Sequence, residues 1–236
     1  MYEFTIIVPV YNEEDNLERV EIELLAYTKI ATKKTTVLFV NDGSKDKSQE
    51  LIEAVCARNE DFHFIHFTKN HGLSTAIKAG FDMVETEFVG YIDSDLQTAP
   101  EDFNLLLAHI GEYDFVTGVR ANRKDSFIKN TSSTIANGIR RIFTQDEMDD
   151  TGCPLKVIKT DFAKRIPMFK GLHRFLPAMI LLQNGTVLQV PVQHFPRLAG
   201  TAKYGLWNRL LGPLMDCFAY LWMKKKYINY EVKNRR

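Results

Sequence analysis

The sequence has no excess of either charge. Its 236 residues contain 30 Lys and Arg against 30 Asp and Glu, so the formal net charge is zero. This balance argues against a uniformly basic nucleic-acid-binding protein. The charges are nevertheless separated along the chain, because residues 203–236 carry eight basic and two acidic side chains and residues 1–202 therefore carry a net −6. The basic C-terminal segment needs an explanation of its own.

Cysteine is scarce, and long apolar runs are missing. The cysteines are odd in number, lie far apart and form no Cys-x-x-Cys or Cys/His metal spacing; they are Cys56, Cys153 and Cys217. This pattern is typical of a reducing compartment. The N-terminus enters a strand-like run at once, so we expect no targeting segment. Residues 206–223 are apolar but contain Arg209 and Asp216, and they fall short of the ~18–20 uninterrupted apolar residues of a membrane-spanning helix.

Glycine-rich nucleotide motifs and repeats are absent as well. The first strand-like run is not followed by Gly-x-Gly-x-x-Gly, and no P-loop pattern occurs, so dinucleotide and P-loop sites are weak interpretations. No repeat, low-complexity tract or Gly/Ser/Pro-rich linker divides the chain. With 45% hydrophobic and 25% charged residues, the composition excludes a disordered protein and favours one domain with an appendage.

The first half alternates between strand-like and helical segments. Short apolar runs predict strands, and apolar residues three or four apart predict helices between them. The expected strands are 4–10, 35–40, 62–67, 88–92 and 115–118, and the expected helices are 13–30, 46–59, 74–84 and 100–110. This order predicts an α/β protein with a mostly parallel central sheet flanked by helices on both faces. The second half is less regular, with helical spacing at 127–143 and 172–183 and strands at 155–158 and 187–192.

Three polar clusters follow expected strands at the point where each strand ends. They are residues 11–13 (Tyr-Asn-Glu), 41–44 (Asn-Asp-Gly-Ser) and 93–97 (Asp-Ser-Asp-Leu-Gln). Each alone is most simply a turn or a helix cap. Together they are expected to converge on one crevice, because ligands bind parallel sheets beyond the carboxyl ends of the strands.

Asp93 and Asp95 are candidate metal ligands. In extended backbone, side chains two residues apart share a face about 6–7 Å along the chain, where two carboxylates repel unless a cation lies between them. Mg²⁺ and Mn²⁺ prefer such oxygen ligands and bridge to substrate phosphates. Gln97 offers a further carbonyl oxygen. The alternative is a pair of solvated acids that cap the helix expected from residue 100.

Basic and small residues mark two further features. Arg197 and Lys203 flank Gly200, and two basic groups on a glycine-containing loop can close over a phosphate, although scattered basic residues are usually a solvated face.

Gly72, Ala76 and Gly80 lie four apart on one face of the 74–84 helix, which predicts close packing on the sheet.

The C-terminal segment is amphipathic and ends in Lys224, Lys225 and Lys226. Its apolar residues recur three or four apart: Leu206, Leu210, Leu211, Leu214, Phe218, Leu221 and Trp222. An interfacial helix with a basic flank lies on an anionic membrane. A core or dimer-packing helix with a solvated tail is the alternative. We therefore divide the chain into a domain of residues 1–205 and an amphipathic segment of residues 206–236.

Taken together, these segments resemble glycosyltransferase family 2. Within it they are most similar to polyprenyl-phosphate glycosyltransferases of the dolichol-phosphate mannosyltransferase and undecaprenyl-phosphate aminoarabinose transferase type. The matching segments are 8–14 (VPVYNEE), 41–46 (NDGSKD), 70–80, 93–97 with 100–101, 118–120 (GVR) and 197–203. Family members commonly carry an acid where this chain has Asn41 and a serine where it has Ala202.

The resemblance implies a glycosyltransferase A fold and a set of site residues. The residues implied to contact the donor nucleotide are Pro9, Tyr11, Glu13, Asp42, Asp93 and Ser94. The implied metal ligands are Asp93, Asp95 and Gln97, and those implied to face an acceptor phosphate are Arg120, Lys129 and Ser133. Arg197 and Lys203 would lie on a loop over the donor diphosphate. Asp150 stands where relatives with hydroxyl acceptors place a base.

The implied activity is a metal-dependent, inverting transfer of a sugar from a nucleotide diphosphate to a polyprenyl phosphate. The expected cofactors are Mg²⁺ or Mn²⁺ with a UDP- or GDP-linked sugar, and nucleic acid is not an expected partner. We expect a cytoplasmic protein at the inner face of the membrane, with peripheral membrane contact and either a homo-oligomer or a membrane-protein partner. The alternatives are a soluble family 2 enzyme that acts on a glycan hydroxyl and a nucleotide-sugar-binding module without activity.

Overall fold

The computed structural model describes residues 1–120, 138, 140–196, 206–230 and 233, with side chains of residues 206–211 and 213 left aside. In these residues seven strands form one sheet in the order β3-β2-β1-β4-β6-β5-β7. The strands are β1 (Phe4–Val10), β2 (Thr35–Asn41), β3 (Phe62–His66), β4 (Phe88–Tyr91), β5 (Phe115–Arg120), β6 (Lys156–Lys159) and β7 (Val187–Val192). β6 is antiparallel to β4 and to β5, and the other described pairings are parallel. The predicted mostly parallel sheet is confirmed.

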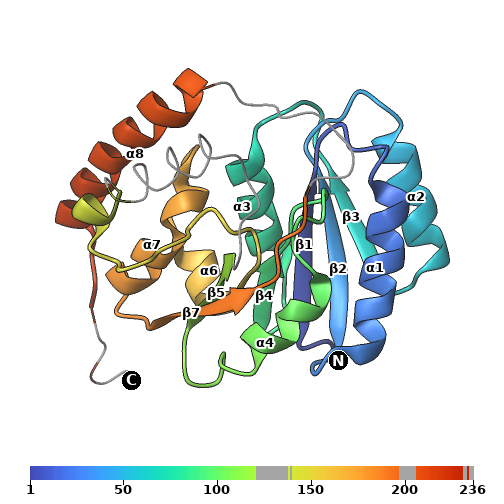
Figure 1. Cartoon of the computed structure of the whole chain (residues 1–236), viewed down its shortest axis with the longest axis horizontal. Coiled ribbons are helices and arrows are strands. Elements are labelled where there is room, and N and C mark those ends of the chain that lie inside the picture. Colours follow the sequence, from blue (N-terminus) through green and yellow to red (C-terminus); the bar gives the residue numbers. More distant parts are fainter. Residues whose placement is uncertain (121–137, 139, 197–205, 231–232, 234–236) are drawn as a thin grey trace.

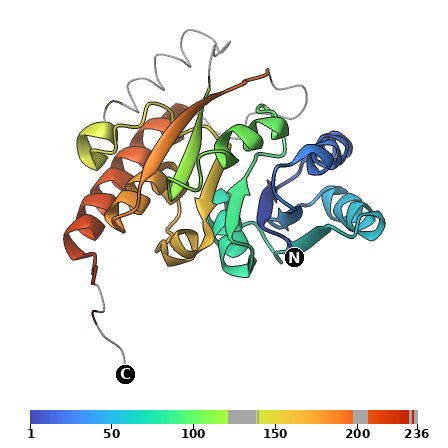
Figure 2. The same ribbon diagram turned by 90° about the horizontal axis from the view of Figure 1, so that it is seen from below.

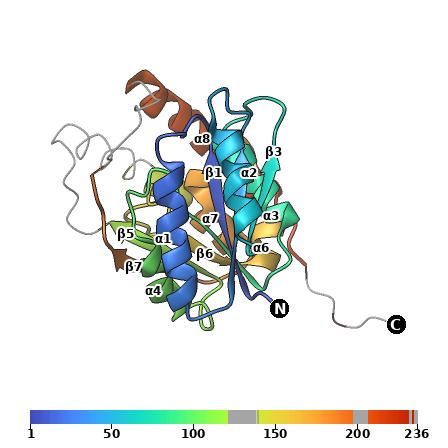
Figure 3. The same cartoon turned by 90° about the vertical axis from the view of Figure 1, so that its right-hand side faces the viewer.

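Helices cover both faces of this sheet (Figure 1). One face packs α1 (Leu17–Ile30), α2 (Ser48–Arg58) and α4 (Phe103–Leu107), which follows the 3₁₀ turn η1 (Pro100–Asp102). The other face packs, in chain order, α3 (Leu73–Met83), α6 (Thr160–Arg165), the 3₁₀ turn η2 (Leu172–Phe175), α7 (Leu176–Leu182) and α8 (Leu206–Lys226). Figure 3 shows α1 and α3 on opposite sides of β1. Within the described part of the chain, each helix is too short or too polar to cross a lipid bilayer.

Several predicted helices have different boundaries in the structure, and the one expected at 100–110 divides into η1 and α4, which ends at Leu107. The helix expected at 13–30 begins at Leu17, because residues 13–16 form a turn in which the Asn16 amide donates to the Glu13 carboxylate at 2.7 Å. The helix expected at 172–183 divides into η2 and α7. Pro177 has no N–H to donate, so it stands in the first turn of α7, where that group has no helical partner.

The C-terminal helix α8 packs at the end of the molecule opposite α1 and α2 (Figure 2). Cys217 and Tyr220 on its inner side are buried in the core, where the Tyr220 ring stacks on Phe175 at 5.9 Å between centroids. Asp216 lies within 3.9 Å of the Arg174 guanidinium. The helix α8 therefore packs on the same hydrophobic core as the sheet.

The small-residue face of α3 packs directly on β1. Ala76 and Gly80 are buried, and a Cβ atom placed on Gly80 would lie 2.8 Å from Cγ1 of Ile7. This approach aligns the N-terminus of α3 with the carboxyl edge of the sheet. The predicted close packing is confirmed at residues 76 and 80, whereas Gly72 precedes the helix as its N-cap, and a Cβ there would meet only Cε of Lys170 at 3.9 Å.

We expect Gly80→Ala to lower the free energy of unfolding by about 1–3 kcal/mol, because the added methyl overpacks against the stiff, β-branched Ile7. Gly111→Ala serves as the control, since an added Cβ there meets no atom within 4 Å, and it should stay within about 0.5 kcal/mol of wild type. Urea unfolding followed by circular dichroism measures both. Equal losses in the two variants would contradict the close approach.

Candidate active site

The carboxyl ends of the central strands share one edge with the start of β6. In the parallel pairs, Val10 is in register with Asn41 and Ile7 with Tyr91. β6 runs the other way, so its first residue, Lys156, pairs with Tyr91 near the end of β4. The turn before β6 is therefore placed beside the loops that follow the parallel strands. The structure brings all three predicted polar clusters to this edge, together with the segment around Asp150.

The first two polar clusters contact each other directly. The backbone N–H of Asn12 donates to Oγ of Ser44 at 3.0 Å, and Oδ1 of Asn12 accepts the N–H of Lys45 at 2.8 Å. The N–H of Glu13 donates to Oγ of Ser48, also at 3.0 Å. These bonds hold the loop after β1 against the loop after β2.

Asp42 connects the end of β2 to the loop before α3. Its buried carboxylate accepts hydrogen bonds from the side-chain amide of Asn70 at 2.8 Å, from the N–H of His71 at 2.6 Å and from the N–H of Gly72 at 2.8 Å. Gly43 adopts a φ of +66°, and a Cβ there would lie 2.6 Å from Cα of Lys69. The turn therefore requires glycine to bring Asp42 to this loop. The sequence alone assigned Asp42 to the donor and gave no sign of these three bonds.

The Asp93–Gln97 loop is tied down from two sides. Asp95 is buried and its Oδ1 accepts the N–H of Gln97 at 3.3 Å, while Asp93 is half-buried. The guanidinium of Arg19 donates to the carbonyl oxygen of Leu96 at 3.1 Å. The carbonyl of Gln97 accepts the N–H of Phe195 at 2.8 Å, so the segment after β7 meets this loop.

Protein side chains alone supply few metal ligands at this edge. The described residues contain no group of three or more His, Cys, Asp or Glu that could hold a metal ion. Two carboxylates and the Gln97 carbonyl are hard oxygen ligands that suit Mg²⁺ or Mn²⁺ when substrate oxygens complete the shell. The donor set therefore fits an ion that binds together with a phosphate ligand.

Arg120 and Asp150 form an ion pair at the same edge. The Nε and Nη2 atoms of Arg120, at the end of β5, donate to the two carboxylate oxygens of Asp150 at 2.7 and 2.8 Å. Both side chains are largely buried, with 13% and 7% of their area exposed. Gln189 on β7 accepts the N–H of Asp149 at 2.8 Å and steadies the turn. Two residues that the sequence assigned to different roles thus touch each other.

Four of the predicted site residues lie outside the described residues. They are Lys129, Ser133, Arg197 and Lys203. Pro9, Tyr11, Glu13 and Ser94 lie at the edge already described, on β1 and in the loops that follow β1 and β4.

Two titratable groups at this edge, the buried Lys156 and the half-buried His173, were not predicted. Lys156 has no exposed surface, and burial lowers the pKa of its amine to about 8. Burial likewise lowers the pKa of His173 to about 3; Nδ1 of this residue lies 2.8 Å from Oγ of Ser74, which also accepts the N–H of Gly171. The sequence did carry one signal, since Lys156 interrupts an otherwise apolar run at residues 155–158.

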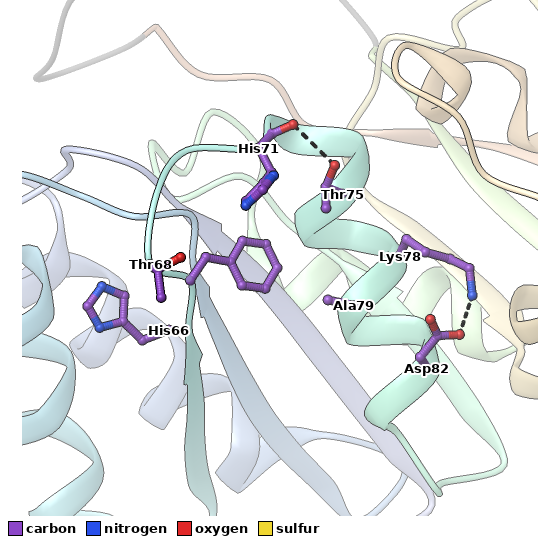
Figure 4. Close-up of a pocket in the computed structure, with 8 residues that line it drawn as sticks. His66, Thr68, His71, Thr75, Lys78, Ala79 and Asp82 are labelled. Carbon is purple, nitrogen blue, oxygen red and sulfur yellow. Dashed lines mark hydrogen bonds and ion pairs between the residues drawn. The ribbon is translucent and has the colours of Figure 1, made fainter.

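A separate pocket of about 500 Å³ opens between the end of β3 and α3 (Figure 4). The ring centroids of Phe67 and His71 are 5.8 Å apart. Its lining residues are His66, Phe67, Thr68, His71, Thr75, Lys78, Ala79 and Asp82. None of the predicted site residues lines this pocket, so we treat it as separate from the candidate site.

Comparison with protein families gives a match over most of the chain. The model described as glycosyl transferase family 2 matches residues 5–166. Undecaprenyl-phosphate 4-deoxy-4-formamido-L-arabinose transferases from Yersinia pestis and Yersinia pseudotuberculosis are 33% identical over 221 residues, which cover 92% of this chain and 67% of theirs.

Solved structures show the same fold at low sequence identity. Mannosyl-3-phosphoglycerate synthase from Rubrobacter xylanophilus has a TM-score of 0.71 and 13% identity, with 99% of this chain and 77% of that chain covered. The mannosyltransferase PcManGT from Pyrobaculum calidifontis, in complex with GDP-Man and Mn²⁺, has a TM-score of 0.68 and 16% identity, with 93% and 64% covered. Glucosyl-3-phosphoglycerate synthase from Mycobacterium tuberculosis, in complex with Mn²⁺ and UDP, has a TM-score of 0.64 and 12% identity, with 95% and 78% covered. The predicted glycosyltransferase A fold is confirmed.

We expect Asp42→Asn to lower the free energy of unfolding by about 1–3 kcal/mol, because its amide nitrogen would face backbone N–H groups that lose their acceptor. Asp82→Asn is the matched control. Asp82 pairs with Lys78 on the surface of α3, and loss of this ion pair should lower the free energy of unfolding by less than about 0.5 kcal/mol. Thermal and urea unfolding provide the comparison, and a loss at Asp82 as large as that at Asp42 would contradict the role given to the buried carboxylate.

Proposed function

The chain belongs to glycosyl transferase family 2 and is a glycosyltransferase, and from this we propose that it transfers a sugar, with inversion, from a nucleotide diphosphate to an undecaprenyl-type polyprenyl phosphate. The observation that carries the proposal is the 33% identity, over 92% of the chain, to transferases named for undecaprenyl phosphate. The two largely buried partners at the site edge, Arg120 and Asp150, fit the same acceptor class.

We assign the donor to the side of the edge formed by the loops after β1, β2 and β4. Pro9, Tyr11, Glu13 and Ser94 face the nucleotide in this proposal, and Asp42 acts by fixing the loop before α3 as well as by facing the nucleoside. Asp93, Asp95 and Gln97 would hold Mg²⁺ or Mn²⁺, and the ion would supply Lewis-acid stabilisation of charge on the leaving diphosphate. Structural neighbours in complex with Mn²⁺ and UDP or GDP-Man support this class of donor and leave the nucleobase open.

The acceptor side needs positioning more than proton transfer. A lipid phosphate is already ionised near pH 7, so its oxygen attacks without a strong base. Arg120 binds that phosphate, with Lys129 and Ser133 as further contacts. Asp150 orients Arg120 by accepting hydrogen bonds from Nε and Nη2 of its guanidinium. In this role Asp150 does not act as a base toward a hydroxyl acceptor.

The basic loop completes the proposed site from the β7 side. The N–H of Phe195 donates to the carbonyl of Gln97, so Phe195 contacts the Asp93–Gln97 loop. Arg197 follows two residues later in the sequence. We assign Arg197 and Lys203 to the donor diphosphate, where positive charge stabilises the charge that develops on the leaving group.

The outer side of α8 supports contact with the membrane that holds such an acceptor. Met215, Phe218 and Trp222 are 67%, 53% and 68% exposed, and the buried Cys217 and Tyr220 lie on the opposite side. Lys224, Lys225 and Lys226 follow at the end of the helix. An exposed apolar stripe with a basic flank is suited to an anionic lipid surface. We propose a peripheral position at the cytoplasmic face of the membrane; the other occupants of the stripe would be a second copy of the protein or a membrane protein.

The reaction itself is tested with a panel of UDP- and GDP-linked sugars, Mn²⁺ and undecaprenyl phosphate in detergent, with products identified by mass spectrometry. We expect one donor to give a glycosylated lipid phosphate in a metal-dependent reaction. Transfer to a glycan hydroxyl in place of the lipid phosphate would favour the alternative acceptor. Binding of a donor without any transfer would contradict an enzymatic role.

Asp95→Asn should lower the transfer rate at least about 100-fold and weaken Mn²⁺ binding in the presence of UDP or GDP, because one of the proposed carboxylate ligands is lost. Asp161→Asn, at an exposed position on α6, should change neither. Electron paramagnetic resonance of Mn²⁺ reports binding independently of turnover. Near-wild-type activity of Asp95→Asn with the metal still required would overturn the ligand assignment.

The double variant Phe218→Ser/Trp222→Ser should bind liposomes that contain anionic lipid about tenfold or more weakly than wild type, since it removes two of the exposed apolar groups. Ile22→Ser/Met83→Ser is the matched control, because those side chains are 60% and 61% exposed on α1 and α3. Flotation of the full chain with vesicles measures both. Equal flotation of the two double variants would argue against α8 as the contact.

A further inference from the structure

Lys156 is a charged side chain in the interior of the protein. Its relative exposure is 0%, and its neighbours on β6, Val157 and Ile158, are buried apolar residues. Burial lowers the pKa of its amine to about 8. Burial of an ammonium group costs free energy that an apolar side chain of similar size would avoid. The presence of lysine at this position therefore needs a specific partner to explain it.

The two hydrogen-bond acceptors of Lys156 belong to a single turn. Its Nζ donates to the carbonyl oxygen of Thr151 at 3.3 Å and to that of Cys153. The same atom lies 5.1 Å from the centre of the Tyr91 ring, on the strand next to β6. The ammonium group thus joins the turn at residues 151–153 to the end of β4.

That turn shapes the position of Arg120. Asp150, the residue before it, accepts both guanidinium bonds from Arg120. Gly152 lies directly beside the same guanidinium, and a Cβ there would be 3.0 Å from Nη2 of Arg120. A shift of the turn would move the carboxylate and the backbone that together hold this arginine.

We propose that Lys156 is a positioning residue for acceptor binding: by holding the carbonyl groups of Thr151 and Cys153, it fixes Asp150 and, through Asp150, the guanidinium of Arg120. The inference rests on the proposed role of Arg120 toward the acceptor phosphate. Lys156 itself touches no substrate in this account. Its main effect falls on the acceptor side, since the turn supplies both of its hydrogen-bond acceptors, while the loop that holds Asp42 and the Asp93–Gln97 loop have their own hydrogen bonds.

The test compares Lys156→Met with Lys159→Met in the full chain. Lys159 lies on the same strand, but its ion pair with Asp114, at 2.8 Å, is at the opposite edge of the sheet. We expect Lys156→Met to raise the KM for undecaprenyl phosphate about tenfold or more, equivalent to about 1.4 kcal/mol, with the KM for the donor within about twofold of wild type. Lys159→Met should change neither constant.

Two further measurements separate positioning from general support of the fold. Asp150→Asn and Lys156→Met should be non-additive in their effect on the acceptor KM, because both act through Arg120. Lys156→Gln, which keeps an N–H donor without the charge, should recover part of the acceptor affinity. Additive effects, or an equal rise of the donor and acceptor KM values, would overturn the proposal. Loss of folding in both Lys156 variants would also contradict it, because the role would then extend beyond this edge.

Failure of the proposed function is distinguishable from failure of this inference. If the wild-type protein transfers no sugar to a lipid phosphate, the acceptor assignment is wrong, whatever Lys156 does. Amide hydrogen exchange of residues 150–155 reports on the turn without any substrate. Lys156→Met should accelerate exchange there and leave residues 41–44 unchanged, and unchanged exchange at 150–155 would contradict the positioning role.

Discussion

The pairing of β6 with β4 is the constraint on which the candidate site depends. β6 is antiparallel to its neighbours, so its first residue is in register with Tyr91 and the turn before it lies at the carboxyl edge of the parallel strands. A parallel strand at this place would have sent that turn to the far edge of the sheet. The Asp93–Gln97 loop and the Arg120–Asp150 pair can act on one reaction only because this strand direction brings them to one edge.

Buried charge at this edge is matched to specific donors. The Asp42 carboxylate accepts two backbone N–H groups and one side-chain amide, and that of Asp150 accepts N–H groups from Nε and Nη2 of Arg120. A buried carboxylate with such partners has its oxygens hydrogen-bonded and orders the loops that surround it. The negative charge contributed by the first 202 residues is in part structural, because it fixes loops whose remaining surface faces the substrate.

Much of this arrangement could be predicted from the sequence. Apolar runs between helical segments located β1 to β5, and polar clusters after three of these strands located the edge, because parallel strands share their carboxyl ends. The direction of β6 was not predictable, since this strand is short and lies far along the sequence from β4 and β5, the strands that it pairs with. The bonds of Asp42 and the burial of Lys156 were equally hidden, because they join segments that are distant in sequence or depend on packing. The apolar stripe along α8 was predicted from its spacing. That Phe218 and Trp222 on this stripe face outward could be seen only in the tertiary structure.

The central claim is that donor and metal bind at the carboxyl edge of this sheet. Amide hydrogen exchange of the full chain, with and without Mn²⁺ and UDP or GDP, tests it most directly. The account predicts protection of residues 9–14, 41–46 and 93–97 when metal and nucleotide are present together, with no change in α2. Protection confined to the pocket around His66 and Phe67, or to the outer surfaces of α1 and α2, would contradict it.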